Sequence, residues 1–185
     1  MQQLSDVEAE AWCASKGLTV APGLASARIQ LPIQTPRVRL VTRGNAVTLA
    51  GLAYSLLLSP SLPRDEAHFE GALVWLQRWE LWSESIDRMG YALIGGLRGE
   101  RAESAGLDQR PAQLFGPEEF VQASACLLIP LIFQWDAFLI PSNGRMVVFM
   151  SHEERLEVMC VRDEERMELV ERFRSWAPVE SDGTD

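Results

Sequence analysis

Hydrophobic and polar positions are patterned most clearly between Leu127 and Val161. An apolar run, LLIPLIFQ, leads into WDAFLIP, MVVFM and LEVMCV, three short segments rich in aliphatic and aromatic residues. Asn143-Gly144 separates the first two segments, and the polar stretch 151–155 separates the last two. An Asn-Gly pair between apolar runs is a strong signal for a β-hairpin. The pattern therefore predicts a helix followed by a three-stranded antiparallel meander.

Several helix starts are marked by capping residues. Ser5 and Glu8 match a capping box, in which a Ser hydroxyl and a Glu carboxylate each bond a free backbone amide of the first turn. Proline is favourable at a first helical position and unfavourable inside a helix, so Pro117 marks a start and Pro130 a kink or an end. These signals predict helices that begin near Ser5, Asn45, Ser83, Pro117 and Asp163.

The segment from Asp65 to Trp79 carries apolar residues at helical spacing, which predicts a further amphipathic helix. For the helix that Ser83 caps, we expect Ile86, Met89, Leu93 and Leu97 on the inner face. Residues 27–42 predict two strands. The apolar residues of the 65–79 stripe fall at i, i+3, i+4, i+7 and i+10: Phe69, Ala72, Leu73, Leu76 and Trp79.

These elements predict an α+β fold, in which an antiparallel sheet of three or more strands, including the C-terminal meander, is covered by five or six helices gathered on one face. A chain of 185 residues fits one domain, residues 1–185. Within it we expect a flexible loop at about 98–113, which is polar and contains Gly and Pro, and a frayed acidic tail at 178–185.

The charge is acidic and unevenly distributed. The formal net charge is −9, and residues 101–185 carry 16 acidic against 8 basic residues. Nucleic-acid binding requires a positive surface, so nucleic acid is not an expected partner. We expect a basic protein partner that contacts Glu153, Glu154 and Glu157, although acidity that serves solubility alone is the simpler alternative.

Cysteine usage and hydropathy favour a cytoplasmic protein. Cys13, Cys126 and Cys160 form no paired framework, which suits a reducing compartment. We interpret Cys126 as a core residue and not as a nucleophile paired with His152. The N-terminal residues lack the pattern of a signal peptide. The longest apolar stretch, 123–133, is too short to span a bilayer, so no membrane association is expected.

The polar turn at 151–155 holds the best-placed titratable residues. His152 beside Asp136 and Glu153 is a candidate general base. A turn between two strands is polar in any case, so a solvated turn is the alternative. Metal binding needs more convergent ligands, and the second histidine, His68, lies far away in the sequence. We therefore predict neither a metal nor a cofactor.

Tryptophan is concentrated in one segment. Trp75, Trp79 and Trp82 lie within eight residues, and tryptophan is enriched in binding hot spots. We predict Trp75 and Trp82 as exposed binding residues. Packing of these rings in the core is the alternative.

Three motifs resemble those of a bacterial family that has no established activity. They are LVWLQRWELWSES, LFGPEEF, and FQWDAFLIP with VVFMSHEE, and they span roughly residues 69–160. This chain departs from the family pattern at Gln134, Gln113 and Glu153, where Gly, His and Asp are usual. The resemblance implies a shared architecture and no reaction. Acidity and fold class also make the chain similar to small bacterial immunity proteins.

The leading hypothesis is a non-enzymatic cytoplasmic module that binds a basic protein, of immunity or accessory type. One alternative is a hydrolase-like enzyme that uses His152, Asp136 and Glu153. The other is a structural subunit of a homo-oligomer that associates through Trp75 and Trp82. The oligomeric state itself is left open.

Overall fold

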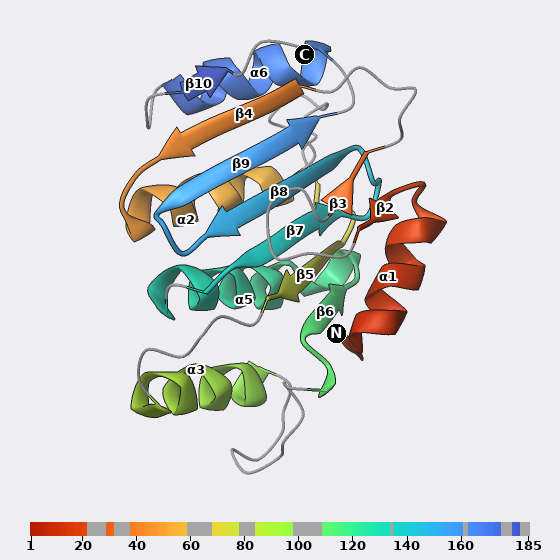
Figure 1. The fold of residues 1–185 in the computed structure, drawn as a ribbon, viewed down its shortest axis with the longest axis vertical. Helices are drawn as coiled ribbons and strands as arrows, with labels where there is room; N and C mark the ends of the chain where they lie inside the picture. The colour runs from red at the N-terminus through yellow and green to blue at the C-terminus, as the bar shows by residue number, and fades with distance from the viewer. Residues whose placement is uncertain are drawn as a thin grey trace.

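The computed structural model describes residues 1–21, 29–31, 38–58, 68–77, 84–97, 109–133, 135–160, 163–174 and 179–181. These residues form an eight-stranded sheet in which every strand pair is antiparallel (Figure 1). In spatial order its strands are β1 (Gln2–Leu4), β6 (Ala112–Phe115), β5 (Ala72–Leu76), β7 (Ala137–Pro141), β8 (Met146–Ser151), β9 (Arg155–Cys160), β4 (Val38–Arg43) and β10 (Val179–Ser181). A separate small hairpin pairs β2 (Thr19–Val20) with β3 (Ile29–Gln30).

The helices lie on both faces of the sheet, and two separate core clusters show this arrangement. Four helices contribute to the larger cluster: α2 (Ala46–Leu57), α3 (Glu84–Leu97), α5 (Phe120–Phe133) and α6 (Asp163–Arg174). A 3₁₀ turn, η2 (Pro117–Glu119), leads into α5. The smaller cluster joins α1 (Asp6–Ser15) and the β2–β3 hairpin to the opposite face. In Figure 1, α2 and α5 lie behind the sheet and α1 lies to its right.

The α+β fold class is therefore confirmed, with five α-helices among the described residues. The expected gathering of all helices on one face is wrong, because α1 packs on the other face. None of the helices in the described ranges is long and apolar enough to cross a membrane.

The central strands are buried on both sides. In β5, β7 and β8 every residue is buried. Because successive side chains of a strand point to opposite faces, Val74 faces the larger helical cluster, whereas its neighbour Trp75 faces the smaller one. Phe138 and Phe149 join Trp75 there, with ring centroids 5.1 Å apart between the two phenylalanines. The sheet is thus the middle layer of three.

The predicted helix over 65–79 is wrong where it is described, because residues 72–76 form β5. The sequence ALVWL is apolar at every position, so apolar residues occur at helical spacing in it even though it forms a strand. A continuous apolar run is also typical of a strand buried on both faces. Trp75 is fully buried, and its Nε1–H donates to Asp6 Oδ1 at 2.9 Å, which ties β5 to the start of α1.

The predicted caps at Ser5 and Asn45 are confirmed, whereas Asp163 is the first helical residue of α6 and not the cap before it. Ser5 Oγ accepts from the Glu8 N–H at 3.3 Å, and Glu8 Oε2 accepts from the Ser5 N–H at 2.8 Å. The second of these bonds lowers the pKa of Glu8, because it stabilises the charged carboxylate. Asn45 caps α2 by accepting from the Thr48 N–H at 3.0 Å. The expected cap of α3, Ser83, lies outside the described residues.

The three-stranded meander is confirmed as β7, β8 and β9. Four short strands were not predicted: β1, β2, β6 and β10. Residues 112 and 113, expected in a loop, belong to β6, which pairs with both β1 and β5. Residues 179–181, expected in a frayed tail, form β10 and pair with β4. Residues 98–108 of the expected loop, and residues 178 and 182–185 of the expected tail, lie outside the described residues.

Helix α3 packs through a glycine against the ring of Trp135. A Cβ at Gly90 would lie 2.5 Å from Trp135 Cη2, whereas a Cβ at Gly96 would meet no atom within 4 Å. Ile94 is buried on the same inner face. The expectation that Met89 and Leu93 face inward is wrong, since their side chains are 61% and 48% exposed. Leu97 is partly buried against the core, as expected, and the side chain of Ile86 is not among those described.

We expect Gly90→Ala to destabilise the fold and Gly96→Ala to stabilise it. The new methyl group at residue 90 must displace a buried indole ring, which costs about 1–3 kcal/mol. The same change at residue 96 gains up to about 1 kcal/mol of helix propensity. Chemical denaturation of both variants measures the two effects, and equal destabilisation by both would contradict the packing of α3 on Trp135.

Candidate functional site

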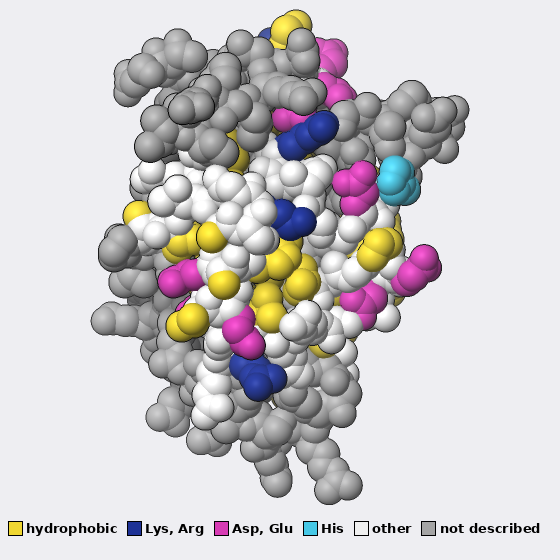
Figure 2. Space-filling model, turned by 90° about the vertical axis from the view of Figure 1, so that its right-hand side faces the viewer, with side chains coloured by type: hydrophobic (Ala, Val, Ile, Leu, Met, Phe, Trp, Pro, Cys, Tyr) yellow, Lys and Arg dark blue, Asp and Glu magenta, His cyan; other side chains and the backbone are white. Residues whose placement is uncertain are grey.

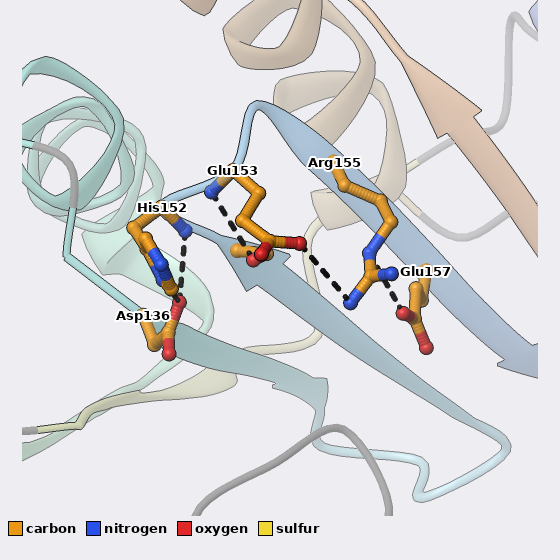
Figure 3. A network of polar contacts seen from close by, with 6 residues as sticks. Asp136, His152, Glu153, Arg155 and Glu157 are labelled. Carbon is orange, nitrogen blue, oxygen red and sulfur yellow. Dashed lines mark hydrogen bonds and ion pairs between the residues drawn. The ribbon is translucent and has the colours of Figure 1, made fainter.

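The turn between β8 and β9 brings an aspartate and a histidine together (Figure 3). Asp136 immediately precedes β7, His152 immediately follows β8, and Ala137 is paired with Met150 in the register of these strands. The two ends therefore meet at one edge of the meander. Asp136 Oδ1 accepts from the backbone N–H of His152 at 2.8 Å and lies 2.9 Å from its ring Nδ1.

This geometry assigns the two ring nitrogens different roles. An ionised carboxylate only accepts hydrogen bonds, so Nδ1 of the neutral imidazole carries the proton and Nε2 holds the lone pair. The same orientation prepares histidine as a general base in hydrolase triads. Asp136 is buried and His152 is partly buried. Two of the three candidate catalytic residues, Asp136 and His152, are thus in contact.

The third candidate, Glu153, turns toward Arg155 (Figure 3). Its Oε2 lies 3.9 Å from an Arg155 guanidinium nitrogen, and its backbone N–H donates to Ser151 Oγ at 3.2 Å. Arg155 also pairs with Glu157, with 3.0 Å between Nε and Oε1. Arg155 is therefore the counter-ion of both glutamates.

Of the three glutamates expected to contact a partner, one is withdrawn from the surface. Glu157 is 1% exposed, so it is a buried, paired charge and not a binding residue of this surface. Glu153 is 59% exposed at its side chain, and Glu154 is exposed as well. The acidic surface that the turn presents thus consists of two carboxylates.

Glu154 has an unusual backbone conformation. Its φ is +55°, the only positive value of a non-glycine among the described residues. It is the last of three turn residues between Ser151 and Arg155, which are paired with each other. Three-residue hairpin loops place a left-handed residue at this position, and glycine is favoured there. An L-residue pays about 1–2 kcal/mol for this conformation.

The predicted tryptophan anchors are not supported by the packing. Trp75 is fully buried in the smaller core cluster, so it is not an exposed binding residue. Trp79 and Trp82 lie outside the described residues. The prediction that Trp75 contributes to an exposed association surface is therefore wrong, and the part that concerns Trp82 is not described.

The described residues outside this turn offer neither a metal site nor an exposed thiol. No three His, Cys, Asp or Glu side chains among the described residues are grouped to hold a metal ion. Cys13, Cys126 and Cys160 are all buried thiols. Burial, with a smaller contribution from the charge of Glu165, raises the pKa of Cys160 to about 12. A thiol of that pKa is a poor nucleophile near neutral pH.

Comparisons with known proteins add no assignment: no family model, no curated protein and no solved structure matches this chain. The function proposed below therefore rests on the geometry of the turn.

Two features of the site were missed in the sequence. Arg155 lies two residues before Glu157, and residues at this spacing share one face of a strand. That spacing was a usable signal for the Arg155–Glu157 ion pair. The left-handed position of Glu154 also had a signal, because a three-residue loop between paired strands requires one such residue.

The carboxylate–imidazole contact predicts a single tautomer of His152. Nitrogen-detected NMR of the imidazole rings should show neutral His152 protonated at Nδ1. His68, whose Nε2 lies 3.6 Å from a carboxylate oxygen of Glu70, is the internal comparison, because there the facing nitrogen is Nε2. In Asp136→Asn, the Nδ1 signal of His152 should shift and its tautomer should become mixed. An Nε2-protonated His152 in the unmodified protein would contradict the geometry.

Proposed function

We propose that this protein is a non-enzymatic, cytoplasmic protein-binding module of immunity or accessory type, and that the β8–β9 turn presents Glu153 and Glu154 to a basic partner. The observation that carries the proposal is the left-handed conformation of Glu154. The three-residue loop requires a left-handed residue at this position whatever its side chain, so the informative point is that a glutamate and not a glycine occupies it. Strained backbone positions concentrate at functional sites. Glycine would remove the strain but also the carboxylate.

The turn is suited to binding because its base is rigid. Asp136 fixes His152 through two contacts, and the Gly44 N–H donates to the Glu154 carbonyl oxygen at 3.3 Å, which links the turn to the end of β4. A binding residue held on a fixed backbone loses less conformational entropy when a partner docks. The excess of acidic residues in 101–185 would steer a basic partner toward this half of the chain.

The net acidity of the chain does not by itself identify which surface binds a partner. Figure 2 shows the side of the protein that lies to the right in Figure 1, and hydrophobic side chains gather at its centre with acidic and basic side chains around them. The proposal therefore depends on the position of the two turn carboxylates and not on net charge. The cytoplasmic part of the proposal is supported by the three cysteines, which are all free.

The proposal predicts opposite effects of Glu154→Gly on stability and on binding. Relief of the left-handed strain should raise the free energy of unfolding by about 1 kcal/mol. Loss of the carboxylate should weaken partner binding, mainly through a slower association rate that depends on salt. The partner would first be isolated from lysate at low salt by affinity capture and mass spectrometry, and its purified form would then be titrated against each variant.

Two controls separate the turn from general acidity. Glu154→Gln removes the charge and keeps the strained backbone, so it should weaken binding without stabilising the fold. Glu168→Gln makes the same change of net charge on an exposed position of α6, and it should leave binding unchanged. Equal losses from Glu154→Gln and Glu168→Gln would rule out the turn as the binding site.

The Asp136–His152 contact favours one alternative, a hydrolase-like enzyme in which His152 activates a water molecule. This alternative predicts hydrolysis of at least one member of a panel of ester, phosphodiester and peptide substrates. His152→Gln and Asp136→Asn should abolish that activity, whereas Glu153→Gln should leave it unchanged, because Glu153 faces Arg155. Activity that survives His152→Gln would exclude this role for the dyad.

A further inference from the structure

Helix α5 carries a second line of apolar side chains that the core does not use. Its inner side is buried against the sheet through residues such as Ala123 and Leu127. On its outer side Val121, Leu128 and Ile132 are 74%, 44% and 62% exposed, and the half-buried Ala125 lies between the first two. We refer to these four residues as the α5 seam.

The spacing of the α5 seam matches a helical partner. Its members are separated by four, three and four residues, which is the alternation of the core positions of a coiled coil. Side chains at this spacing form one narrow stripe along a helix, about 16 Å long from Val121 to Ile132. A stripe of that shape is covered best by a second helix that lies along it.

The absence of charge on the α5 seam restricts the chemistry of its partner. Residues 120–133 contain no charged side chain, although the whole chain carries a net charge of −9. A basic partner would find no carboxylate on this helix to pair with. A partner helix matched to it is itself uncharged and exposes an apolar line. Among the described residues α5 meets both conditions, whereas the uncharged helix α2 exposes only Tyr54 of its described large hydrophobic residues.

The spacing is also symmetric, which points to a second copy of this chain. The pattern of four, three and four is the same in both directions, so two antiparallel copies of α5 related by a two-fold axis bring matching positions together. Val121 of each copy then faces Ile132 of the other, and the small Ala125 faces the larger Leu128. A two-fold interface requires this kind of self-complementarity.

The neighbouring helix extends the uncharged area. Helix α3 packs beside α5, and its exposed Met89 and Leu93 belong to a stretch, 89–97, without charged residues. Exposed apolar positions on two adjacent helices are more than isolated surface residues, and such patches mark protein interfaces.

We propose that the chain forms a two-fold dimer through antiparallel packing of its α5 seams. This interface is separate from the β8–β9 turn and does not depend on the function proposed for it. Sedimentation velocity over a concentration series should show a reversible monomer–dimer equilibrium for the unmodified protein. Val121→Glu and Ile132→Lys should each weaken dimerisation by more than roughly 30-fold, the effect expected of a hot-spot substitution.

Mixing the two variants tests the register. In the antiparallel arrangement Glu at 121 of one chain faces Lys at 132 of the other, so an equimolar mixture should form a heterodimer although each variant alone is monomeric. Two variants serve as controls because they place the same charge on exposed positions off the seam: Gln122→Glu on α5 and Met167→Glu on α6. Both should dimerise as the unmodified protein does.

Three results would overturn the dimer proposal, each at a different step. A monomeric unmodified protein at every concentration would show that a second copy does not cover the seam. Dimers of Val121→Glu as stable as those of Gln122→Glu would place the interface elsewhere. Monomeric single variants whose mixture stays monomeric would overturn the antiparallel register. Circular dichroism and unfolding midpoints of each variant establish that a loss of dimer is not a loss of fold.

Discussion

Burial of the central strands on both faces is the constraint on which the rest of this structure depends. β5, β7 and β8 expose no residue, so each face of the sheet requires its own covering layer. Four helices cover one face, and α1 with the β2–β3 hairpin covers the other. Trp75 joins these parts, because its ring fills the smaller cluster and its Nε1–H bonds to Asp6 at the start of α1. Any loss of α1 would therefore expose an aromatic face of the sheet.

The candidate site depends on the same constraint. The register of β7 and β8 places Asp136 beside His152, and the rigidity of two fully buried strands keeps that contact short. The turn beyond it combines a fixed base with a strained, exposed carboxylate at Glu154. Its acidic surface is smaller than the sequence alone indicates, because Arg155 neutralises Glu157 inside the protein. The α5 seam lies on a different element and offers apolar contact without charge, so the molecule carries two surfaces of opposite character.

Elements with local signals could be predicted from the sequence, and elements defined by distant contacts could not. The capping box at Ser5 and the Asn143-Gly144 turn are encoded within a few residues, and both were found. β6 and β10 are three or four residues long and exist through pairing with strands far away in the chain. β5 was misassigned because burial on both faces removes the alternation that identifies a strand. At the site, the Asp136–His152 contact followed from the meander, but the burial of Glu157 depends on what covers that face of β9.

Hydrogen exchange measured residue by residue tests the three-layer arrangement most directly. Amides of residues 72–76 should exchange as slowly as those of β7 and β8, because β5 bonds to strands on both sides and is covered on both faces. The backbone amide of His152 should also be protected, since Asp136 accepts its hydrogen bond. Rapid exchange at residues 72–76 beside protected β7 and β8 would contradict a central β5, and with it the account of how the sheet, its two covering layers and the turn are held together.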